Sequence, residues 1–360
     1  MKIILATGGT GGHLFPALKV AEELRKGGHE VLLWGSFTIG LDRIQAQGFV
    51  FKNFYARGLV LNSLKGIAVS VWSILRATFC AFCSLRTVRP DVVCGFGGYG
   101  AFPIVVSAVF LRIPTMIHEQ NVVPGRANKI LSKLVRKIAL SFEQSKKYFN
   151  TQKTIVTGCP TNIYLSHLDK TQVLKKFGLD RNRKTILIFG GSQGAHRINE
   201  EALKVVELLV QQNRLVQYIH ICGKNDLSIV RKKYDALKVP SALYDFFSPM
   251  EEAYTAADVI ISRAGAVSVT EMALFGRPAI LIPYPHAQGH QRENAMALKE
   301  TGLAHVIEEN DITTGYLAQV IINFLDKRIE LTSENIFACK MFFSDSQKRL
   351  ASEIVRLSQK

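Results

Sequence analysis

Residues 2–13, KIILATGGTGGH, carry the strongest fold signal in the chain. An apolar run leads into a glycine-rich turn, and the apolar side chains between Leu14 and Leu24 then recur with the period of a helix. A further apolar run over 30–34 is typical of a second strand. This stretch therefore predicts a strand, helix, strand unit whose glycines lie at the turn between the first strand and the helix.

The same pattern continues along the chain and then starts again. Residues 185–189 predict a strand that runs into a second glycine turn at 190–194, followed by a helix over 195–212. Strands that alternate with helices form parallel sheets covered on both faces. The chain is therefore predicted to be an α/β protein with two Rossmann-like, doubly wound domains that face each other across a cleft. Further strands are predicted at 91–94, 115–118, 137–141, 154–157, 217–222, 258–262 and 279–283.

Length and composition agree with two domains. The chain has 360 residues, of which 48% are hydrophobic, so it is long and apolar enough for two cores and too apolar for a disordered chain. We expect the boundary near Gly158-Cys159-Pro160, with an N-terminal domain over 1–160 and a C-terminal domain over 161–340. A helix at about 341–360 is expected to pack back on the N-terminal domain.

The cysteines and the first residues predict a cytoplasmic, reduced protein. Six cysteines are scattered along the chain, and the N-terminal residues run directly into a strand without the apolar segment of a signal peptide. Cys80 and Cys83 form a C-x-x-C, but they lie in an apolar, helix-like run and have no second pair. Core packing is therefore favoured over redox chemistry or zinc binding for these two.

An apolar segment over 66–85 comes nearest to a membrane span. Arg76 interrupts it, and Lys65, Arg86 and Arg89 flank it, so we do not expect it to cross a bilayer. The pattern alone allows a buried helix or a helix that lies at a membrane interface with its cations toward lipid headgroups.

Positive charge is concentrated in the first half of the chain. Residues 1–160 carry 20 Lys and Arg against 7 Asp and Glu, whereas residues 161–360 carry 25 against 22. A basic half favours an anionic partner, such as nucleic acid, an acidic leaflet or a phosphorylated substrate. Nucleic acid is disfavoured, because no aromatic side chains alternate with the basic ones.

Glycine-rich turns at 8–13, 95–100 and 190–194 can each hold phosphate, since glycine lets the backbone approach closely and a helix start presents free N–H groups. The first turn lacks the G-x-G-x-x-G pattern of dinucleotide enzymes, because Leu14 stands at the third glycine position. An NAD-dependent enzyme is therefore disfavoured. His13 follows that turn and is a candidate general base, although a lone histidine is more often a capping or packing residue.

Polar residues also follow several later strands. Glu271 lies on a predicted helix after the strand at 258–262, where a carboxylate can bind ribose hydroxyls. The motif HEQN at 118–121 ends another strand. Burial of polar side chains without hydrogen-bond partners costs free energy, so we expect this cluster to be exposed in a cleft and to have a functional role. The zinc motif H-E-x-x-H would need histidine where Val122 stands, so we expect no metal.

Six motifs together resemble the MurG family of GT-B glycosyltransferases: GGTGGH at 8–13, GFGGYG at 95–100, HEQN at 118–121, GGSQGA at 190–195, SRAGAVSVTE at 262–271 and HQRENA at 290–295. The resemblance covers nearly the whole chain. It implies transfer of N-acetylglucosamine from UDP-N-acetylglucosamine to the 4-hydroxyl of the muramoyl sugar of lipid I, giving lipid II with inversion. It also implies a peripheral protein on the cytoplasmic face of the bacterial inner membrane, association with other cell-wall synthesis proteins, and no cofactor or metal. With the family in view, the interfacial alternative is preferred for parts of 64–86.

The resemblance also implies roles for individual residues. It implies His13 as the base, with Glu119 as a second candidate. Donor contacts are implied for Thr10, Gly11, Gly12, Asn121, Ser192, Phe247, Ala266, Val267, Ser268, Val269, Thr270, Glu271 and Gln291, and acceptor contacts for Gly97, Gly98 and Tyr99.

One position departs from the family's pattern. The family usually has an arginine shortly after the Gly-x-Pro between the domains, whereas this chain reads Gly158-Cys159-Pro160-Thr161-Asn162. Asn162 cannot supply a cation, so either a nearby basic residue replaces it or donor binding is weaker, and we expect the weaker binding. Three alternatives remain open at this stage: a UDP-sugar 2-epimerase, a glycolipid transferase with another acceptor, and a non-catalytic nucleotide-sugar-binding subunit.

Overall fold

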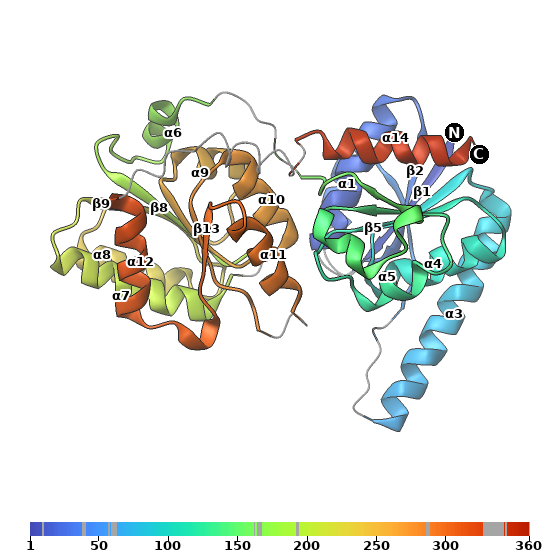
Figure 1. Cartoon of the computed structure of the whole chain (residues 1–360), viewed down its shortest axis with the longest axis horizontal. Coiled ribbons are helices and arrows are strands. Elements are labelled where there is room, and N and C mark those ends of the chain that lie inside the picture. Colours follow the sequence, from blue (N-terminus) through green and yellow to red (C-terminus); the bar gives the residue numbers. More distant parts are fainter. Residues whose placement is uncertain are drawn as a thin grey trace. The chain divides into compact units, whose positions relative to one another are not determined.

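The computed structural model of the chain divides into two compact units (Figure 1). Unit 1 comprises Met1–Asn162 together with Asp345–Lys360, and unit 2 comprises Ile163–Ser344. The C-terminal segment therefore belongs to the same unit as the N-terminus. The structure describes residues 1–360 except 9–10, 38–40, 57, 59–62, 162, 164–167, 192–193, 286–288, 327–341, 343 and 360.

Unit 1 is built on a seven-stranded parallel sheet with the strand order β3-β2-β1-β4-β5-β6-β7. The order reverses between β1 and β4, and such a switch point is where ligands of doubly wound folds bind. The strands are β1 (Lys2–Gly8), β2 (Glu30–Ser36), β3 (Val50–Asn53), β4 (Val92–Gly95), β5 (Thr115–Glu119), β6 (Lys137–Leu140) and β7 (Thr154–Val156). The helices are α1 (Gly11–Lys26), α2 (Leu41–Ala46), α3 (Leu64–Val88), α4 (Gly98–Phe110), α5 (Arg126–Leu131) and α14 (Ser346–Ser358), with short 3-10 helices at Glu143–Tyr148 and Thr151–Lys153.

Both faces of this sheet are covered by helices, as the alternation of side chains along β1 requires. Ile3 and Leu5 point into one core, which they share with α1 and with Leu350 and Ile354 of α14. Ile4 lies in the opposite core, which is closed by α4 and the C-terminal part of α3. The C-terminal helix α14 thus covers the same sheet face as α1 (Figure 1).

Unit 2 repeats this architecture with a six-stranded parallel sheet of order β10-β9-β8-β11-β12-β13. Its switch point lies between β8 and β11. The strands are β8 (Lys184–Phe189), β9 (Val216–Ile221), β10 (Ser241–Tyr244), β11 (Val259–Ser262), β12 (Ala279–Leu281) and β13 (Ala304–Val306). The helices are α6 (Lys170–Lys176), α7 (His196–Gln211), α8 (Leu227–Leu237), α9 (Met250–Ala256), α10 (Ala266–Phe275), α11 (His290–Lys299) and α12 (Thr314–Asp326), with a 3-10 helix at Glu309–Asp311. The prediction of two Rossmann-like domains with parallel sheets is confirmed.

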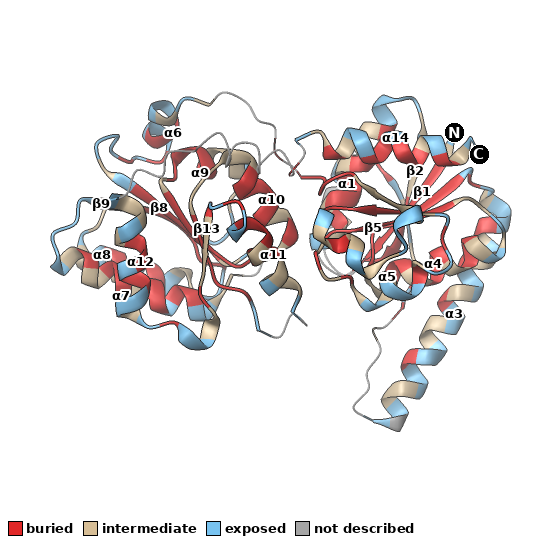
Figure 2. Cartoon of the chain, viewed as in Figure 1, coloured by how far each residue is buried: buried red, intermediate tan, exposed pale blue. Residues whose placement is uncertain are grey.

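Helix α3 is not a buried helix, which was one of the two alternatives that the sequence pattern allowed. Ser63 caps its start by accepting a hydrogen bond from the Gly66 N–H at 3.0 Å. Only a narrow stripe is buried, and the end of the helix that lies away from the sheet carries exposed apolar side chains (Figure 2). The buried alternative is therefore wrong for most of this segment. Core packing is also wrong for Cys80 and Cys83, because both cysteines are exposed on α3.

Candidate functional site

The candidate site of unit 1 lies at the carboxyl edge of its sheet, next to the switch point between β1 and β4. The turn after β1 leads into α1, and the turn after β4 leads into α4. Strand β5 ends at Glu119 on the same edge. The three glycine-rich or polar motifs of the first half, at 8–13, 95–100 and 118–121, are therefore brought to one place by the parallel sheet.

Hydrogen bonds connect His13 to the end of β5. The His13 Nδ1 lies 3.1 Å from the Gln120 Oε1. The Gln120 Nε2 donates to the Phe96 carbonyl at 2.9 Å and lies 3.2 Å from the His118 Nδ1. The His118 Nε2 lies 3.1 Å from the Gly158 carbonyl oxygen. Complete burial lowers the pKa of His118 to about 4, so this imidazole is neutral at physiological pH.

The His13 ring rests on the glycine turn after β4. Gly97 and Gly98 have φ angles of 86° and 76°, which side-chain-bearing residues rarely adopt. A Cβ at Gly97 would lie 3.3 Å from the His13 Cε1, and one at Gly98 would lie 3.4 Å from its Cδ2 and 2.9 Å from the Gly8 carbonyl oxygen. The glycines therefore leave the room that the imidazole occupies. Tyr99 follows in the first turn of α4.

The Glu119 carboxylate holds the loop after β5. Its side chain is 1% exposed. Oε1 accepts from the Asn121 backbone N–H at 2.9 Å and from its amide at 3.3 Å, and Oε2 accepts from the Gly125 N–H at 3.1 Å and the Asn128 amide at 2.9 Å. Both oxygens are thus engaged. This position, which the sequence offers as a second candidate base, ties Asn121 to the edge of the sheet.

In unit 2, helix α10 begins at the carboxyl edge beside the switch point. Gly265 precedes it in extended conformation, and no described side chain caps its first turn. Open space surrounds the position of a Cβ at Gly265. The first N–H groups of α10, those of Ala266, Val267 and Ser268, are therefore able to receive an anion or a polar ligand group. Val269 and Thr270 are buried behind them.

Glu271 lies on α10 with 7% of its surface exposed. Tyr254 of α9, itself fully buried, donates its hydroxyl to the Glu271 Oε2 at 2.9 Å. Burial raises the pKa of Glu271 to about 8, despite that hydrogen bond. A carboxyl group with so high a pKa is costly to ionise, and perturbed groups of this kind are concentrated in binding and catalytic sites.

Gln291 of α11 braces two loops at the same edge. Its Oε1 accepts from the Ala264 N–H at 3.2 Å and from the Tyr284 N–H at 3.0 Å, so it joins the ends of β11 and β12. Arg263, which is buried, donates to the Ile282 carbonyl at 3.2 Å and pairs with Glu309. The loop that precedes α10 is thereby held on both sides.

The remaining donor residues that the resemblance implies lie in both units or outside the described residues. Phe247 follows β10 and packs on Phe177 and Tyr244, with ring centroids 5.2 Å and 4.8 Å apart. Gly11 and Gly12 form the start of α1 in unit 1. Thr10, Ser192 and the unusual Asn162 lie outside the described residues.

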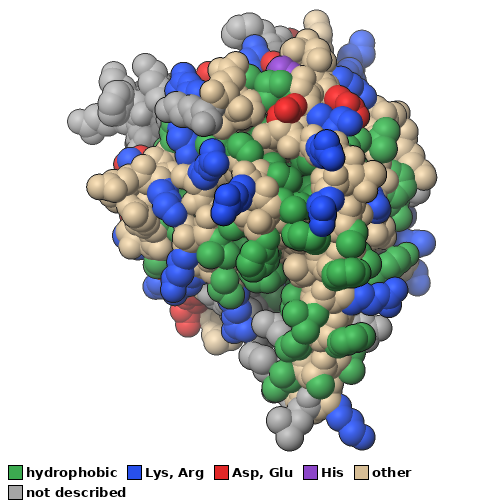
Figure 3. All heavy atoms as spheres, turned by 90° about the vertical axis from the view of Figure 1, so that its right-hand side faces the viewer, with side chains coloured by type: hydrophobic (Ala, Val, Ile, Leu, Met, Phe, Trp, Pro, Cys, Tyr) green, Lys and Arg blue, Asp and Glu red, His purple; other side chains and the backbone are tan. Residues whose placement is uncertain are grey.

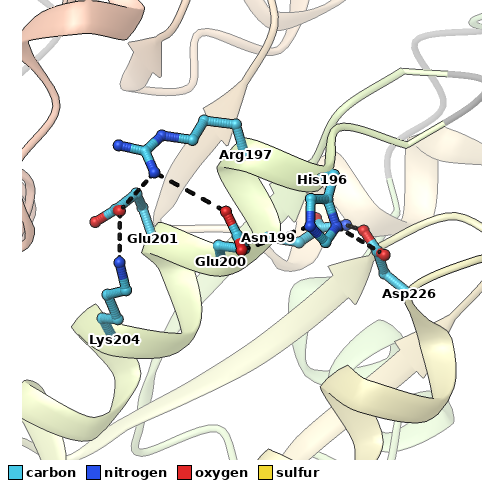
Figure 4. A network of polar contacts seen from close by, with 7 residues as sticks. All are labelled: His196, Arg197, Asn199, Glu200, Glu201, Lys204 and Asp226. Carbon is cyan, nitrogen blue, oxygen red and sulfur yellow. Dashed lines mark hydrogen bonds and ion pairs between the residues drawn. The ribbon is translucent and has the colours of Figure 1, made fainter.

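The start of α7, after the glycine turn that follows β8, is fixed by a polar network (Figure 4). His196 places its Nδ1 2.9 Å from the Asp226 Oδ1, and Asn199 donates to the Asp226 Oδ2 at 2.7 Å. Asp226 raises the pKa of the exposed His196 by hydrogen bonding and charge. Further along the helix, Glu201 binds Lys204 at 2.8 Å and Arg197 at 3.3 Å.

Several of these positioning residues were not identified from the sequence. Gln120, Asn128, Tyr254 and Asp226 received no individual role, although Gln120 lies inside the HEQN motif. Their partners come from elsewhere in the chain, so only the fold reveals them. No group of three or more His, Cys, Asp or Glu side chains within the described ranges could hold a metal ion.

A separate feature is the outer surface of α3. Its exposed apolar side chains include Trp72 and Phe79, each 69% exposed, and Leu75, 58% exposed. Lys and Arg side chains surround the apolar ones on this face of unit 1 (Figure 3). Residues Lys65–Val88 form one helix that is long and apolar enough to cross a membrane by length and composition, with 17% of its most apolar window buried.

Comparisons with known proteins define the class to which this chain belongs. Residues 3–140 match the N-terminal domain of glycosyltransferase family 28, and residues 185–350 match its C-terminal domain. The fold is thus that of a two-domain glycosyltransferase. The chain belongs to glycosyltransferase family 28.

Individual relatives show which members of the family this chain is similar to. The chain is 37% identical to a protein of Thermodesulfovibrio yellowstonii over 91% of this chain and 90% of that one, and 34% identical to one of Geobacter sulfurreducens over 100% of both. Both carry the name UDP-N-acetylglucosamine--N-acetylmuramyl-(pentapeptide) pyrophosphoryl-undecaprenol N-acetylglucosamine transferase. The crystal structure of Acinetobacter baumannii MurG matches 99% of both chains with a TM-score of 0.79 at 29% identity. A UDP-GlcNAc 2-epimerase from Neisseria meningitidis, at 16% identity and a TM-score of 0.68, shows the fold alone.

Proposed function

We propose that this chain transfers N-acetylglucosamine from UDP-N-acetylglucosamine to the 4-hydroxyl of the muramoyl sugar of lipid I, forming lipid II with inversion at the anomeric carbon. The proposal is supported by membership of glycosyltransferase family 28 and by two relatives named as N-acetylglucosamine transferases, which match 91% and 100% of this chain. The observation that carries it is His13, an imidazole held at the sheet edge by Gln120 and by the glycine turn at 97–98.

Inversion requires one in-line displacement. The acceptor hydroxyl oxygen forms the new bond to the anomeric carbon while the bond from that carbon to the UDP oxygen breaks, and its electron pair leaves with UDP. The hydroxyl proton passes to a base, for which we propose His13. Glu119 is less suited, because both its oxygens already accept hydrogen bonds and it is 1% exposed. Gly97, Gly98 and Tyr99 are the proposed acceptor contacts beside His13.

The donor is proposed to bind in unit 2. The N–H groups at the start of α10, which no described side chain caps, suit a diphosphate or ribose, and Glu271 suits the two ribose hydroxyls. Gln291 and Phe247 complete the proposed donor contacts from unit 2, with Ser192, whereas Thr10, Gly11, Gly12 and Asn121 come from unit 1. Stabilisation of the leaving diphosphate by N–H groups and helix ends requires no metal.

Transfer to a defined acceptor tests this function. Labelled N-acetylglucosamine is supplied as its UDP conjugate, with a short-chain lipid I analogue as acceptor and EDTA present. We expect lipid-linked product from the wild type and loss of at least about a hundredfold in kcat for His13→Ala. No lipid-linked product from folded protein that binds UDP-N-acetylglucosamine would contradict the acceptor, and formation of the 2-epimer would favour the epimerase alternative.

We further propose that α3 attaches the protein peripherally to the cytoplasmic face of the inner membrane, where lipid I resides. Burial of Trp72 and Phe79 supplies apolar area, and cations such as Arg76 and Lys65 favour anionic headgroups by about 1 kcal/mol each. The contact of Ala81 and Leu85 with the core of unit 1 supports a helix that lies on the bilayer rather than across it.

Vesicle sedimentation tests this attachment. Trp72→Glu combined with Phe79→Glu is expected to weaken binding to vesicles that contain anionic lipid by at least about tenfold, since each side chain contributes roughly 1.5–3 kcal/mol on burial. Leu215→Glu is the matched control, because Leu215 is also 69% exposed but lies in unit 2. Equal binding by the double variant and the wild type would refute the attachment through α3.

A further inference from the structure

The hydrogen bonds around Gln120 determine which atom of His13 carries the proton. The Phe96 carbonyl oxygen can only accept, so the Gln120 atom 2.9 Å from it must be the amide nitrogen. The amide oxygen, Oε1, therefore faces the His13 Nδ1 at 3.1 Å. Because an amide oxygen can only accept, the proton of this hydrogen bond belongs to the His13 Nδ1.

His118 fixes the same arrangement from the other side. The Gly158 carbonyl oxygen, 3.1 Å from the His118 Nε2, accepts the proton of that nitrogen. The His118 Nδ1 then has a lone pair, which accepts the second N–H of the Gln120 amide at 3.2 Å. The Gln120 amide is 2% exposed, and all three of its described contacts agree with one orientation. A rotated amide would place its oxygen against the Phe96 carbonyl oxygen and against the His118 lone pair.

The position of the proton on the neutral His13 ring determines which ring nitrogen can act as a base. A neutral imidazole has one lone pair, and in water the histidine side chain prefers to carry its proton on Nε2. With the proton on Nδ1, the lone pair of His13 lies on Nε2, the nitrogen that does not contact Gln120. The network therefore reverses the intrinsic preference of the side chain.

We propose that Gln120, oriented by the Phe96 carbonyl and by His118, is a positioning residue that holds His13 in the Nδ1–H tautomer, so that Nε2 receives the proton of the acceptor hydroxyl. This inference rests on the proposed function for the part His13 plays in transfer. When Nε2 takes the proton, the Nδ1–H remains bonded to Oε1, and the positive charge of the imidazolium lies beside the negative end of the amide dipole.

Nitrogen NMR of the full-length chain tests the tautomer directly. The protein is labelled with ¹⁵N at its nine histidines, and the His13 signals are assigned by their loss in His13→Gln. We expect a proton-bearing Nδ1 and an unprotonated Nε2 in the wild type. In Gln120→Leu, which removes the acceptor while keeping similar volume, the signals are expected to move to the Nε2–H form. An Nε2–H tautomer in the wild type, or no change in Gln120→Leu, would overturn the proposal.

A control variant separates positioning from simple destabilisation. Gln217 of unit 2 is a buried glutamine whose amide donates to the Asp180 carbonyl at 2.7 Å and the Thr185 Oγ1 at 2.9 Å. Gln217→Leu is therefore expected to lower the unfolding temperature as Gln120→Leu does, but to leave the His13 tautomer unchanged.

Kinetics supply the second readout. Gln120→Leu is expected to lower kcat by about tenfold to a hundredfold with little change in the donor KM. Gln120→Glu keeps an oxygen toward the His13 Nδ1 but turns its second oxygen toward the Phe96 carbonyl oxygen and the His118 lone pair, so it is expected to lower kcat as Gln120→Leu does. His118→Gln retains a donor and an acceptor and should preserve more activity than His118→Leu. Equal kcat in wild type and Gln120→Leu would refute the proposal even if the tautomer shifts.

The two proposals fail separately. If the wild type shows the Nδ1–H tautomer but makes no lipid-linked product, the positioning holds and the proposed acceptor is wrong. If product forms and requires His13, but the tautomer does not depend on Gln120, the transfer reaction holds and the positioning is wrong.

Discussion

Glu271→Gln is expected to stabilise unit 2 while weakening donor binding. Glu271 is 7% exposed, and burial raises its pKa from 4.5 to about 8. In the unfolded chain the carboxyl group ionises near 4.5, whereas in the folded protein it keeps its proton until about pH 8. Between these values the folded state binds more protons, so the free energy of unfolding falls as pH rises and levels off above pH 8.

The magnitude follows from the size of the shift. One pKa unit corresponds to about 1.4 kcal/mol, so the full change from 4.5 to about 8 costs up to about 5 kcal/mol, of which about 2 kcal/mol is lost between pH 6 and pH 8. Glutamine has nearly the same shape, can still accept the Tyr254 hydroxyl and does not ionise. The free energy of unfolding of Glu271→Gln should therefore not fall between pH 6 and pH 8 on account of this residue.

Urea unfolding at pH 6 and pH 8 measures the difference. The wild type is expected to lose about 2 kcal/mol more than Glu271→Gln over this interval. Glu207→Gln is the control, since Glu207 is a partly exposed glutamate paired with Lys233 in the same unit, and this variant should keep the pH dependence of the wild-type unfolding free energy. Parallel pH dependence of wild type and Glu271→Gln would refute the reasoning. The affinity of Glu271→Gln for UDP tests the ribose contact, and we expect it to fall by at least about tenfold.

Substitutions at Gly97, Leu350 and His220 test the packing beside His13, the docking of α14 and the burial of an imidazole in unit 2. Gly97→Ala and Gly48→Ala both place a side chain at positive φ and should cost about 1–3 kcal/mol each, but only Gly97→Ala, whose Cβ meets the His13 ring, should lower kcat in the transfer assay. Leu350→Ala removes a fully buried side chain that docks α14, and should destabilise unit 1 by about 2–5 kcal/mol in urea unfolding. Burial lowers the pKa of His220 from 6.5 to about 3, so the unfolded chain binds a proton at this residue that the folded unit 2 does not. The free energy of unfolding should therefore fall by about 1.4 kcal/mol for each pH unit below 6.5. His220→Asn should reduce this pH dependence in urea unfolding, and an unchanged pH dependence would contradict the prediction.

The repeated pattern of strand, glycine turn and helix was sufficient to predict both sheets. The strands that were missed, Val50–Asn53, Ser241–Tyr244 and Ala304–Val306, are short and lie at sheet edges. Edge strands are only partly buried, so their sequences lack the continuous apolar run that identifies a central strand. Their existence depends on pairing with a neighbour that the local pattern does not show.

The site was predictable in its motifs and less so in its contacts. A histidine after a glycine turn could be identified from residues 8–13 alone, because both lie in one local segment. Its partner Gln120 lies 107 residues further along the chain, and the carbonyl that orients Gln120 belongs to a third segment, at Phe96. The long apolar helix α3 was ambiguous for a related reason, since hydropathy does not tell whether apolar side chains face a core or the surface.

Ionisation at Glu271 and proton transfer at His13 should act on different kinetic constants. If the ribose hydroxyls donate to the Glu271 carboxylate, donor binding below pH 8 must release a proton, so kcat/KM for the donor rises with pH toward 8. At saturating donor this proton has already left, and kcat then reports the base in unit 1. Glu271→Gln should therefore flatten the pH dependence of donor kcat/KM without moving the acid limb of kcat, whereas Gln120→Leu should lower kcat without changing the pH dependence of donor kcat/KM. A change in the pH dependence of both donor kcat/KM and kcat in either variant would mean that one ionisation controls both steps.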